Sequence, residues 1–343
     1  LFSYSTMFNS VFSFGIDVAT MFLVIGVYFL WGKSNGILAG LFFGLAGITR
    51  LLSLIPIFII FALVLLSTKK NFLKLSSTFL IIFLLSNGIF ILFSGNYYIE
   101  QVYKYHLLKS LGGKENLNEY LGIIKLNWIL FLSALTFIFI KDKKPINMLV
   151  LVSSVYLVFL LSLKKIFGFY FIIIFPFLAI IGGYSIIRFF NQFHLTKKWK
   201  ILIAILLLLI FSWDFVSNVL FLEKIGFTGF ERGKDLTDFI NSASNKDTSL
   251  FGDESVAPLL ALLTNKRIAL DFVDTNDQIF LTGLRDSNKV LSDLKGKDVL
   301  FIIRSKQGIS YFSDVKQFLN TDCEFLSQFH DKIEGSYLVY RCQ

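Results

Sequence analysis

The sequence predicts a polytopic α-helical membrane protein that ends in a soluble α/β domain, and three observations support this fold class. Of the 343 residues, 55% are hydrophobic, and the mean hydropathy is +0.68. Long apolar runs alternate with short charged segments, and about 20 apolar residues are enough to cross a bilayer as a helix. Beyond Gly226 these runs give way to short alternating stretches such as "DVLFIIR", which are typical of strands. We therefore expect a membrane domain over residues 1–225 and a soluble domain over residues 226–343.

The apolar runs predict seven or eight transmembrane segments. The run 36–67 is longer than one span needs and carries Arg50 near its middle. A guanidinium in hydrocarbon costs about 3 kcal/mol even on insertion scales, so we expect two short helices, 36–48 and 51–67, that meet at Arg50. The runs lie at 10–31, 36–67, 73–94, 123–140, 146–163, 167–190 and 199–222.

A stripe of glycines is expected on the first of these two short helices. Gly36, Gly40 and Gly44 recur every fourth residue, which places them on one helix face. Small residues in this pattern let a neighbouring helix approach closely in a membrane. We therefore expect the stripe to mark a helix–helix contact.

The basic residues are concentrated in the membrane domain and predict its orientation. Residues 1–225 hold 19 Lys and Arg against 7 acidic residues, whereas 226–343 hold 14 against 17. This distribution favours anionic membrane lipids as partners and argues against nucleic acid. One set of turns holds eleven basic residues and the opposite set seven, so the first set is expected in the cytoplasm and the soluble domain outside. The first set comprises Lys33, Lys69, Lys70, Lys74, Lys141, Lys143, Lys144, Arg188, Lys197, Lys198 and Lys200.

Four charged side chains are expected together at the outer level of the membrane domain. Asp17 begins the first helix, where a carboxylate is rarely left facing lipid, and Lys164 and Lys165 precede the sixth span. Two interpretations of Arg50 stay open: an anchor that reaches toward the interface, or an anion-binding residue that faces an interior cavity. A site for a lipid-linked phosphate needs such cations to neutralise the phosphate, and a carboxylate to handle a proton or a metal.

The predicted external segment 95–122 mixes aromatic and charged residues and suits a helix that lies in the membrane interface. His106 falls on its polar side. A lone histidine is commonly structural, and a catalytic or ligating role is the alternative. The other two histidines, His194 and His330, are too far away in sequence to suggest a zinc site.

These stretches resemble a known family. The segment "LFSYSTMFNSVFSFGIDVATMFLVIGVYFL" followed by "ILAGLFFGLAGITRLLSLIP" is similar to membrane glycosyltransferases of the GT-C fold. The nearest branch, glycosyltransferase family 39-like, contains the dolichyl-phosphate-mannose protein mannosyltransferases and the lipid A aminoarabinose transferases. Its helix-opening aspartate and its Leu-Thr-Arg helix end match Asp17 and "GITR", which ends at Arg50. Its basic and aromatic run before a proline-containing helix resembles "LKKIFGFYFIIIFPFLAIIGG", with Lys164, Lys165 and Tyr170.

The resemblance, which covers about 220 residues, implies a membrane glycosyltransferase. Such an enzyme moves a sugar from a polyprenyl-phosphate carrier to a protein or lipid acceptor on the extracytoplasmic face of the cell membrane, with inversion. Arg50, Lys164, Lys165 and Tyr170 would bind the donor phosphate, with Asp17 as an active-site carboxylate beside it. The family's main catalytic acid lies in the first external loop, which we expect to precede Leu1, so Asp17 is not given that role.

The soluble domain is expected to be a three-layer α/β sandwich. A strand, a turn, a helix ending at Leu263 and a second strand are expected over "SLFGDESVAPLLALLTNKRIALDFV". Asp271, Asp274 and Asp277 could bind a divalent cation, the one cofactor left open, but they lack the glycine and terminal glutamate of a calcium loop, and a solvated acidic loop is the simpler interpretation. Further helices are expected at 231–243, 286–295 and 309–320, and strands at 298–303, 323–329 and 336–342.

Cys323 and Cys342 are expected to form a disulfide. A hairpin about "DKIEGS" that pairs Phe329 with Ser336 also places the two cysteines opposite one another. An oxidising exterior favours the bond, and a chance pair of thiols is the alternative.

Two other function classes stay open beside the glycosyltransferase. A transporter or flippase of a lipid-linked saccharide also needs cations at membrane depth, and inverted repeats with paired broken helices would favour it. A non-catalytic membrane scaffold with an external binding domain is the third class.

Overall fold

The chain divides into two compact units. The structure is a computed structural model that describes residues 15–67, 69–108, 116–142, 146–163, 166–192, 197–225, 233–254, 256–273, 275–305, 308–331 and 335–343. The first unit comprises Leu1–Tyr103 and Gly112–Leu220, and the second comprises Lys104–Leu111 and Phe221–Gln343. The sequence places Lys104–Leu111 in the membrane domain, whereas the structure groups it with the soluble domain.

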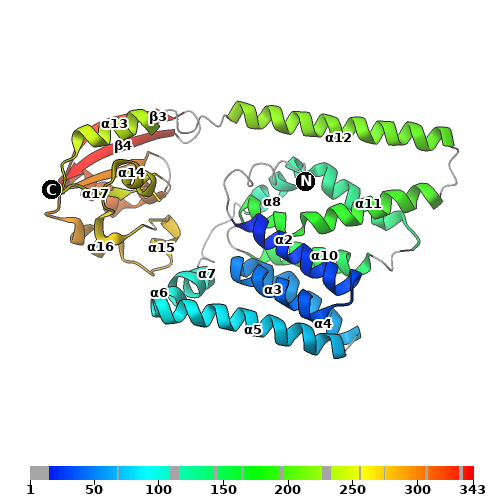
Figure 1. Cartoon of the computed structure of the whole chain (residues 1–343). Helices are drawn as coiled ribbons and strands as arrows, with labels where there is room; N and C mark the ends of the chain where they lie inside the picture. Colours follow the sequence, from blue (N-terminus) through cyan, green and yellow to red (C-terminus); the bar gives the residue numbers. More distant parts are fainter. Residues whose placement is uncertain are drawn as a thin grey trace. The chain divides into compact units, whose positions relative to one another are not determined.

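The first unit consists of apolar helices (Figure 1). Its first half contains α2 (Ile16–Val27), the π-helix η1 (Tyr28–Gly32), α3 (Gly36–Thr49), the 3-10 turn η2 (Leu51–Ser53), α4 (Leu54–Ser67) and α5 (Lys69–Ser94). Its second half contains α8 (Asn116–Leu126), α9 (Trp128–Leu135) with η4 (Thr136–Phe139), α10 (Asn147–Ser162), η5 (Gly168–Ile174), α11 (Phe175–Gln192) and most of α12 (Lys197–Ile225). Side chains from α2, α3, α4, α10 and η5 form one buried apolar core.

The described parts of the seven apolar runs are predominantly helical, which fits a helical membrane protein. By length and composition, three helices in the part of the chain that the structure describes can cross a bilayer: Lys70–Ser94, Gly168–Gln192 and Ile201–Leu220. The bent pair formed by α8 and α9 with η4 adds a fourth candidate, and the remaining runs form apolar helices of 10–17 residues.

The expected break at Arg50 is confirmed. Asn35 caps the start of α3, where its side-chain oxygen accepts a hydrogen bond from the Leu38 amide at 3.1 Å. The helix ends at Thr49 because Arg50 adopts an extended backbone with φ −152° and ψ 121°. Two helices of 14 residues, α3 and α4, therefore replace one long span.

The glycine stripe packs α3 against α5, as expected. A Cβ on Gly40 would lie 2.5 Å from the Leu75 carbonyl oxygen, and one on Gly44 would lie 2.8 Å from the Cβ of Ile82. A Cβ on Gly36 would meet the Asn71 carbonyl oxygen at 3.1 Å. The two helix backbones therefore touch along a line that no side chain separates.

The run 123–140 does not form one straight helix, because the chain bends by 83° between α8 and α9. Asn127 at the bend has φ −117° and ψ 29°, and its side-chain amide donates to the Ile123 carbonyl at 2.8 Å. An asparagine that bonds the preceding turn in this way offers the backbone an alternative to continued helix.

The segment after α5 folds into three short helical pieces, α6 (Asn96–Tyr98), the π-helix η3 (Ile99–Lys104) and α7 (Tyr105–Leu108). Buried Asn87 of α5 accepts hydrogen bonds from the hydroxyls of Tyr98 at 2.6 Å and Tyr103 at 2.5 Å. The aromatic residues thus fasten the start of this segment to α5.

The second unit is built on a four-stranded mixed sheet in the order β1-β2-β4-β3. Strands β1 (Ser249–Gly252) and β2 (Val299–Arg304) are parallel, and β4 (Gly335–Cys342) is antiparallel to both β2 and β3 (Cys323–Asp331). The strand expected after the helix that follows β1 is reduced to one bridge between Leu250 and Ile268. The chain turns away there because Leu270 and Asp271 both have positive φ.

Helices cover both faces of the sheet and give the expected three layers. Leu250, Leu300 and Ile302 face α13 (Gly233–Ala243) and α14 (Ala257–Thr264). Phe251, Phe301 and Ile303 lie in a second apolar cluster with residues of α16 (Ser287–Leu294) and α17 (Ser313–Asp322). The short pieces η6 (Ala269–Asp271), α15 (Asp277–Leu281) and η7 (Gly308–Tyr311) complete the unit. Strand alternation explains the division, because successive residues point to opposite faces.

The two cysteines form a disulfide at the end of the β3–β4 hairpin. From Cys323 to Phe325 the pairing follows the register deduced from the sequence, but from Ser327 onward that register is wrong by one residue. Phe329 faces Tyr337 and not Ser336, because the pairing shifts between Phe325 and Ser327. Such a bulge inserts one extra residue into one strand of the ladder.

Candidate functional site

The chain reversal at Arg50 is held by hydrogen bonds from Ser53. The fully buried Ser53 hydroxyl donates to the Ala46 carbonyl at 2.8 Å and also contacts the Arg50 carbonyl. The Ser53 amide donates to the Arg50 carbonyl at 3.0 Å. The Ala46 carbonyl also accepts a hydrogen bond from the Arg50 amide at 3.0 Å. The Ser53 hydroxyl thus adds a second bond that ties the turn to the end of α3, and Arg50 itself is half-buried.

The start of α2 lies beside the Arg50 guanidinium. Gly15 precedes the helix with φ +70°, and a Cβ placed on it would lie 3.9 Å from Nε of Arg50. The half-buried Asp17 belongs to the first turn of α2, two residues further on. The structure thus brings the start of α2 beside Arg50, whereas the expected closeness of the Asp17 carboxylate to Arg50 stays a prediction.

Tyr170 approaches the same place from η5. Its side chain is 8% exposed, and it interacts electrostatically with Arg50. The hydroxyl of buried Tyr156 on α10 donates to the Tyr170 carbonyl at 3.0 Å, which fixes the backbone of η5. Helix α2 packs directly on η5. Three separate elements, α2, the Arg50 turn and η5, therefore contribute to the candidate site.

Glu119 is a further charged neighbour that the sequence analysis did not select. It lies in the first turn of α8 and interacts electrostatically with Tyr170. The adjacent Tyr120 packs its ring on Phe171 with the ring centroids 5.0 Å apart. Only the contact between α8 and η5 reveals this neighbour, because no local motif distinguishes Glu119 from other loop acids.

If α3 begins at the inner edge of a bilayer, its length leaves Arg50 below the level of the outer headgroups. A helix rises 1.5 Å per residue, so the 14 residues of α3 span about 21 Å. The hydrocarbon core is about 30 Å thick, which leaves Arg50 roughly 9 Å short of the outer edge when α3 begins at the inner edge. This depth favours the interior, anion-binding interpretation of Arg50 over an anchor at the interface.

Three of the selected residues are not placed. Lys164 and Lys165 lie outside the residues that the structure describes. The backbone of His106 belongs to α7, but its side chain is also outside the described part of the chain. The phosphate-binding role of the lysine pair and the catalytic role of His106 therefore stay predictions.

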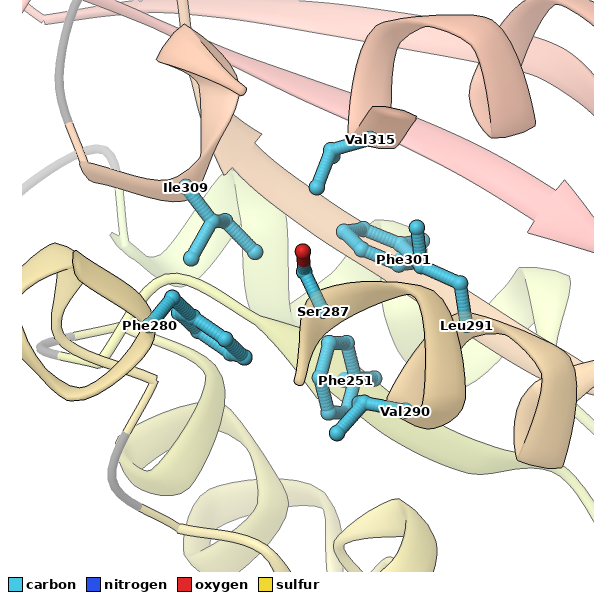
Figure 2. Close-up of a pocket in the computed structure, with 8 residues that line it drawn as sticks. All are labelled: Phe251, Phe280, Ser287, Val290, Leu291, Phe301, Ile309 and Val315. Atoms are coloured by element: carbon cyan, nitrogen blue, oxygen red, sulfur yellow. The ribbon is translucent and has the colours of Figure 1, made fainter. Parts of the chain in front are cut away.

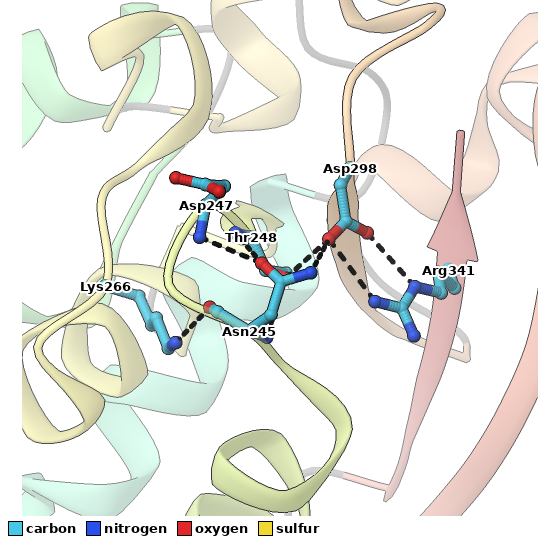
Figure 3. Close-up of polar contacts among 6 residues, drawn as sticks. All are labelled: Asn245, Asp247, Thr248, Lys266, Asp298 and Arg341. Carbon is cyan, nitrogen blue, oxygen red and sulfur yellow. Dashed lines mark hydrogen bonds and ion pairs between the residues drawn. The ribbon is translucent and has the colours of Figure 1, made fainter.

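The soluble domain contains two clusters of polar side chains that hydrogen-bond or form ion pairs with one another. In one of them, Asp298 accepts hydrogen bonds from Arg341 Nε at 3.0 Å, Thr248 at 2.6 Å and Asn245 at 3.1 Å (Figure 3). Chiefly the Arg341 hydrogen bond, helped by Thr248 and Asn245, lowers the pKa of Asp298 below its usual range. In the other cluster, buried Asp253 pairs with Arg304 at 2.6 Å. Both clusters link neighbouring strands, so we assign them a structural role and not a catalytic one.

The described residues of the second unit hold no cluster of metal-ligand side chains. No three His, Cys, Asp or Glu side chains gather in the described residues as metal ligands would. Asp274 of the expected acidic cluster lies outside them. The pocket in Figure 2 is lined mainly by apolar side chains such as Phe251, Phe301 and Ile309, and has a volume of about 10 Å³, room for roughly one water molecule.

Comparison with known proteins finds no matching family model, no similar curated protein and no similar solved structure. The functional argument therefore depends on the residues of this chain.

Proposed function

We propose that the protein is a membrane glycosyltransferase that uses a polyprenyl-phosphate-linked sugar. The observation that carries the proposal is the meeting of the half-buried Arg50 guanidinium with the buried Tyr170 phenol of η5, beside the start of α2. A carrier phosphate needs a fixed cation at the depth where its lipid tail enters the bilayer. The resemblance of the same residues to the GT-C family points to the same chemistry.

In the proposed reaction, an acceptor oxygen bonds to the anomeric carbon of the sugar while the bond from that carbon to the phosphate oxygen breaks. The phosphate takes the electron pair, and Arg50 stabilises the charge that develops there. In this proposal the Tyr170 hydroxyl orients a phosphate oxygen, and Asp17 is an active-site carboxylate beside it. The acceptor proton goes to a general base, a role that we do not assign to Asp17.

The orientation that we propose places this site and the soluble domain on the extracytoplasmic side of the cell membrane. The basic turns on the opposite side support this orientation by the positive-inside rule. The Arg188–Asp142 ion pair, with atoms 3.7 Å apart, holds two of those turns together. The Cys323–Cys342 disulfide in the soluble domain also fits an oxidising compartment.

The direct test measures binding of a radiolabelled short-chain polyprenyl phosphate to the full chain in lipid nanodiscs. Arg50→Ala is expected to weaken binding by at least about tenfold, because hydrogen bonds to a charged group contribute roughly 1.5–3 kcal/mol. Arg50→Lys should bind at an intermediate level, since lysine keeps the charge but lacks the two-pronged donor geometry.

Arg188→Ala is the matched control, because Arg188 is a helical arginine at the opposite end of α11 from η5 and should leave binding unchanged. Wild-type affinity in Arg50→Ala, with both variants inserted and folded, would remove the phosphate role and the proposed function with it.

A transporter or flippase of the same lipid-linked saccharide is the second candidate, and the 83° bend at Asn127 is the observation in its favour. With the turn at Arg50 it gives two interrupted apolar segments, a feature of transporters. The two candidates separate in proteoliposomes loaded with a fluorescent polyprenyl-phosphate sugar. A transporter moves the intact lipid across the bilayer, whereas a glycosyltransferase releases polyprenyl phosphate only when an acceptor is present.

A further inference from the structure

A short segment of the membrane domain is part of the core of the soluble domain. Tyr105 of α7 is 7% exposed and lies in the same buried cluster as Phe251, Leu291 and Phe318. The cluster occupies the face of the sheet covered by α16 and α17. Lys104–Leu111 accordingly belongs to the second compact unit, which otherwise begins at Phe221. The core on this face therefore draws a side chain from a position more than a hundred residues earlier.

The burial of Tyr105 differs from that of the other tyrosines nearby. Tyr97 is 53% exposed, and Tyr98 and Tyr103 bond Asn87 within the first unit. An amphipathic helix that merely lay on a membrane would leave its tyrosines in a common interfacial setting. Tyr105 instead packs in the apolar core of the soluble domain.

Membrane topology imposes a condition on this contact. Between α7 and the soluble domain the chain passes through the bent pair α8–α9, then α10, then η5 with α11, and finally α12. If each crosses once, the chain makes an even number of crossings and returns to the side from which it started. The helix order therefore places α7 and the soluble domain on the same side of the membrane, as the burial of Tyr105 in the domain core requires.

We infer that the α16/α17 face of the soluble domain is a docking surface for α7, so that the domain is held at two points of the chain, by α12 and by α7. Both attachments lie on one side of the membrane. The partner of this surface is the segment Lys104–Leu108 of the same chain, and Tyr105 is its anchor. The inference does not depend on the proposed sugar transfer, since neither test below measures it.

The first test is the sidedness of single cysteines in the full chain, labelled in intact cells by a membrane-impermeant maleimide. The native cysteines do not interfere, because they form a disulfide. Exposed Tyr97 and Asn288 report on the segment and on the soluble domain, and exposed Lys141 reports on the opposite turns. We expect Tyr97→Cys and Asn288→Cys to be labelled from the same side and Lys141→Cys only after permeabilisation. Labelling of Tyr97→Cys and Asn288→Cys from opposite sides overturns the inference.

The second test measures hydrogen–deuterium exchange of β2 in the full chain in nanodiscs. Tyr105→Ser is expected to speed exchange of the slowest β2 amides by on the order of 100-fold, because truncating a buried aromatic residue opens the core around it. Tyr97→Ser is the matched control and should leave the rates unchanged. Equal β2 rates in the two variants would show that Tyr105 is not part of the domain core. If Tyr105→Ser does not fold, the labelling test still decides, because its variants keep Tyr105.

Discussion

Removal of the Cys323–Cys342 disulfide is expected to destabilise the soluble domain by about 3 kcal/mol. The bond joins residues 19 positions apart, and the loop-closure relation for a loop of that size gives this value at 25 °C. Because β3 and β4 are already paired, the native state gains little from the bond, and the effect acts mainly through the unfolded chain. In urea, a slope of about 1.5 kcal/mol per molar would convert the loss into a midpoint shift of about 2 M.

The assay is pulse proteolysis of the full chain in micelles across a urea series, with the protected C-terminal fragment as the readout. The variant is the double substitution Cys323→Ala and Cys342→Ala, and the reduced native chain is the control. Equal midpoints for the reduced chain and the variant would attribute the loss to the cross-link and not to the missing sulfur atoms. A shift below about 0.5 M would refute the reasoning, because it would mean that the unfolded segment is already constrained without the bond.

Two further predictions concern the packing of α3 and the acid stability of the soluble domain. Gly40→Ala should prevent the close approach of α3 and α5, since its Cβ would lie 2.5 Å from a backbone oxygen, whereas Gly88→Ala on α5 meets nothing within 4 Å. Thermal unfolding in detergent should show a clear loss for the first variant, and equal midpoints would contradict the glycine contact. Asp298 has a lowered pKa in the folded state, so its stabilisation is present above the unfolded carboxyl pKa of about 3.9 and is lost as the pH falls toward the lower folded value. Asp298→Asn should therefore be less stable than wild type at pH 7, by about 1–2 kcal/mol, and the difference should shrink at pH 3 in urea titrations; a constant difference would exclude this linkage.

Local chemistry was sufficient to predict the helices and the break between them. Arg50 interrupts an apolar run, and glycine spacing marks the face of α3 that meets α5; both are properties of a single helix. The layers of the soluble domain also follow from short-range alternation. The cysteine pair could be matched because both residues belong to one hairpin.

The features that the sequence did not reveal depend on contacts between distant segments or on one side-chain hydrogen bond. The bend at Asn127 arises from its bond to Ile123, and the hairpin bulge between Phe325 and Ser327 leaves no composition signal. Glu119 joins the candidate site, and Tyr105 joins the soluble core, through packing between elements far apart in the chain. Neither placement can be deduced from periodicity, which describes a single element.

The hydroxyl of Ser53 has one more consequence for the chain reversal. The Ala46 and Arg50 carbonyls already accept hydrogen bonds from the backbone amides of Arg50 and Ser53, and the hydroxyl gives each of them a second donor. One small side chain thereby links the end of α3 to the start of the next element, so the direction in which the chain leaves α3 depends on a single residue.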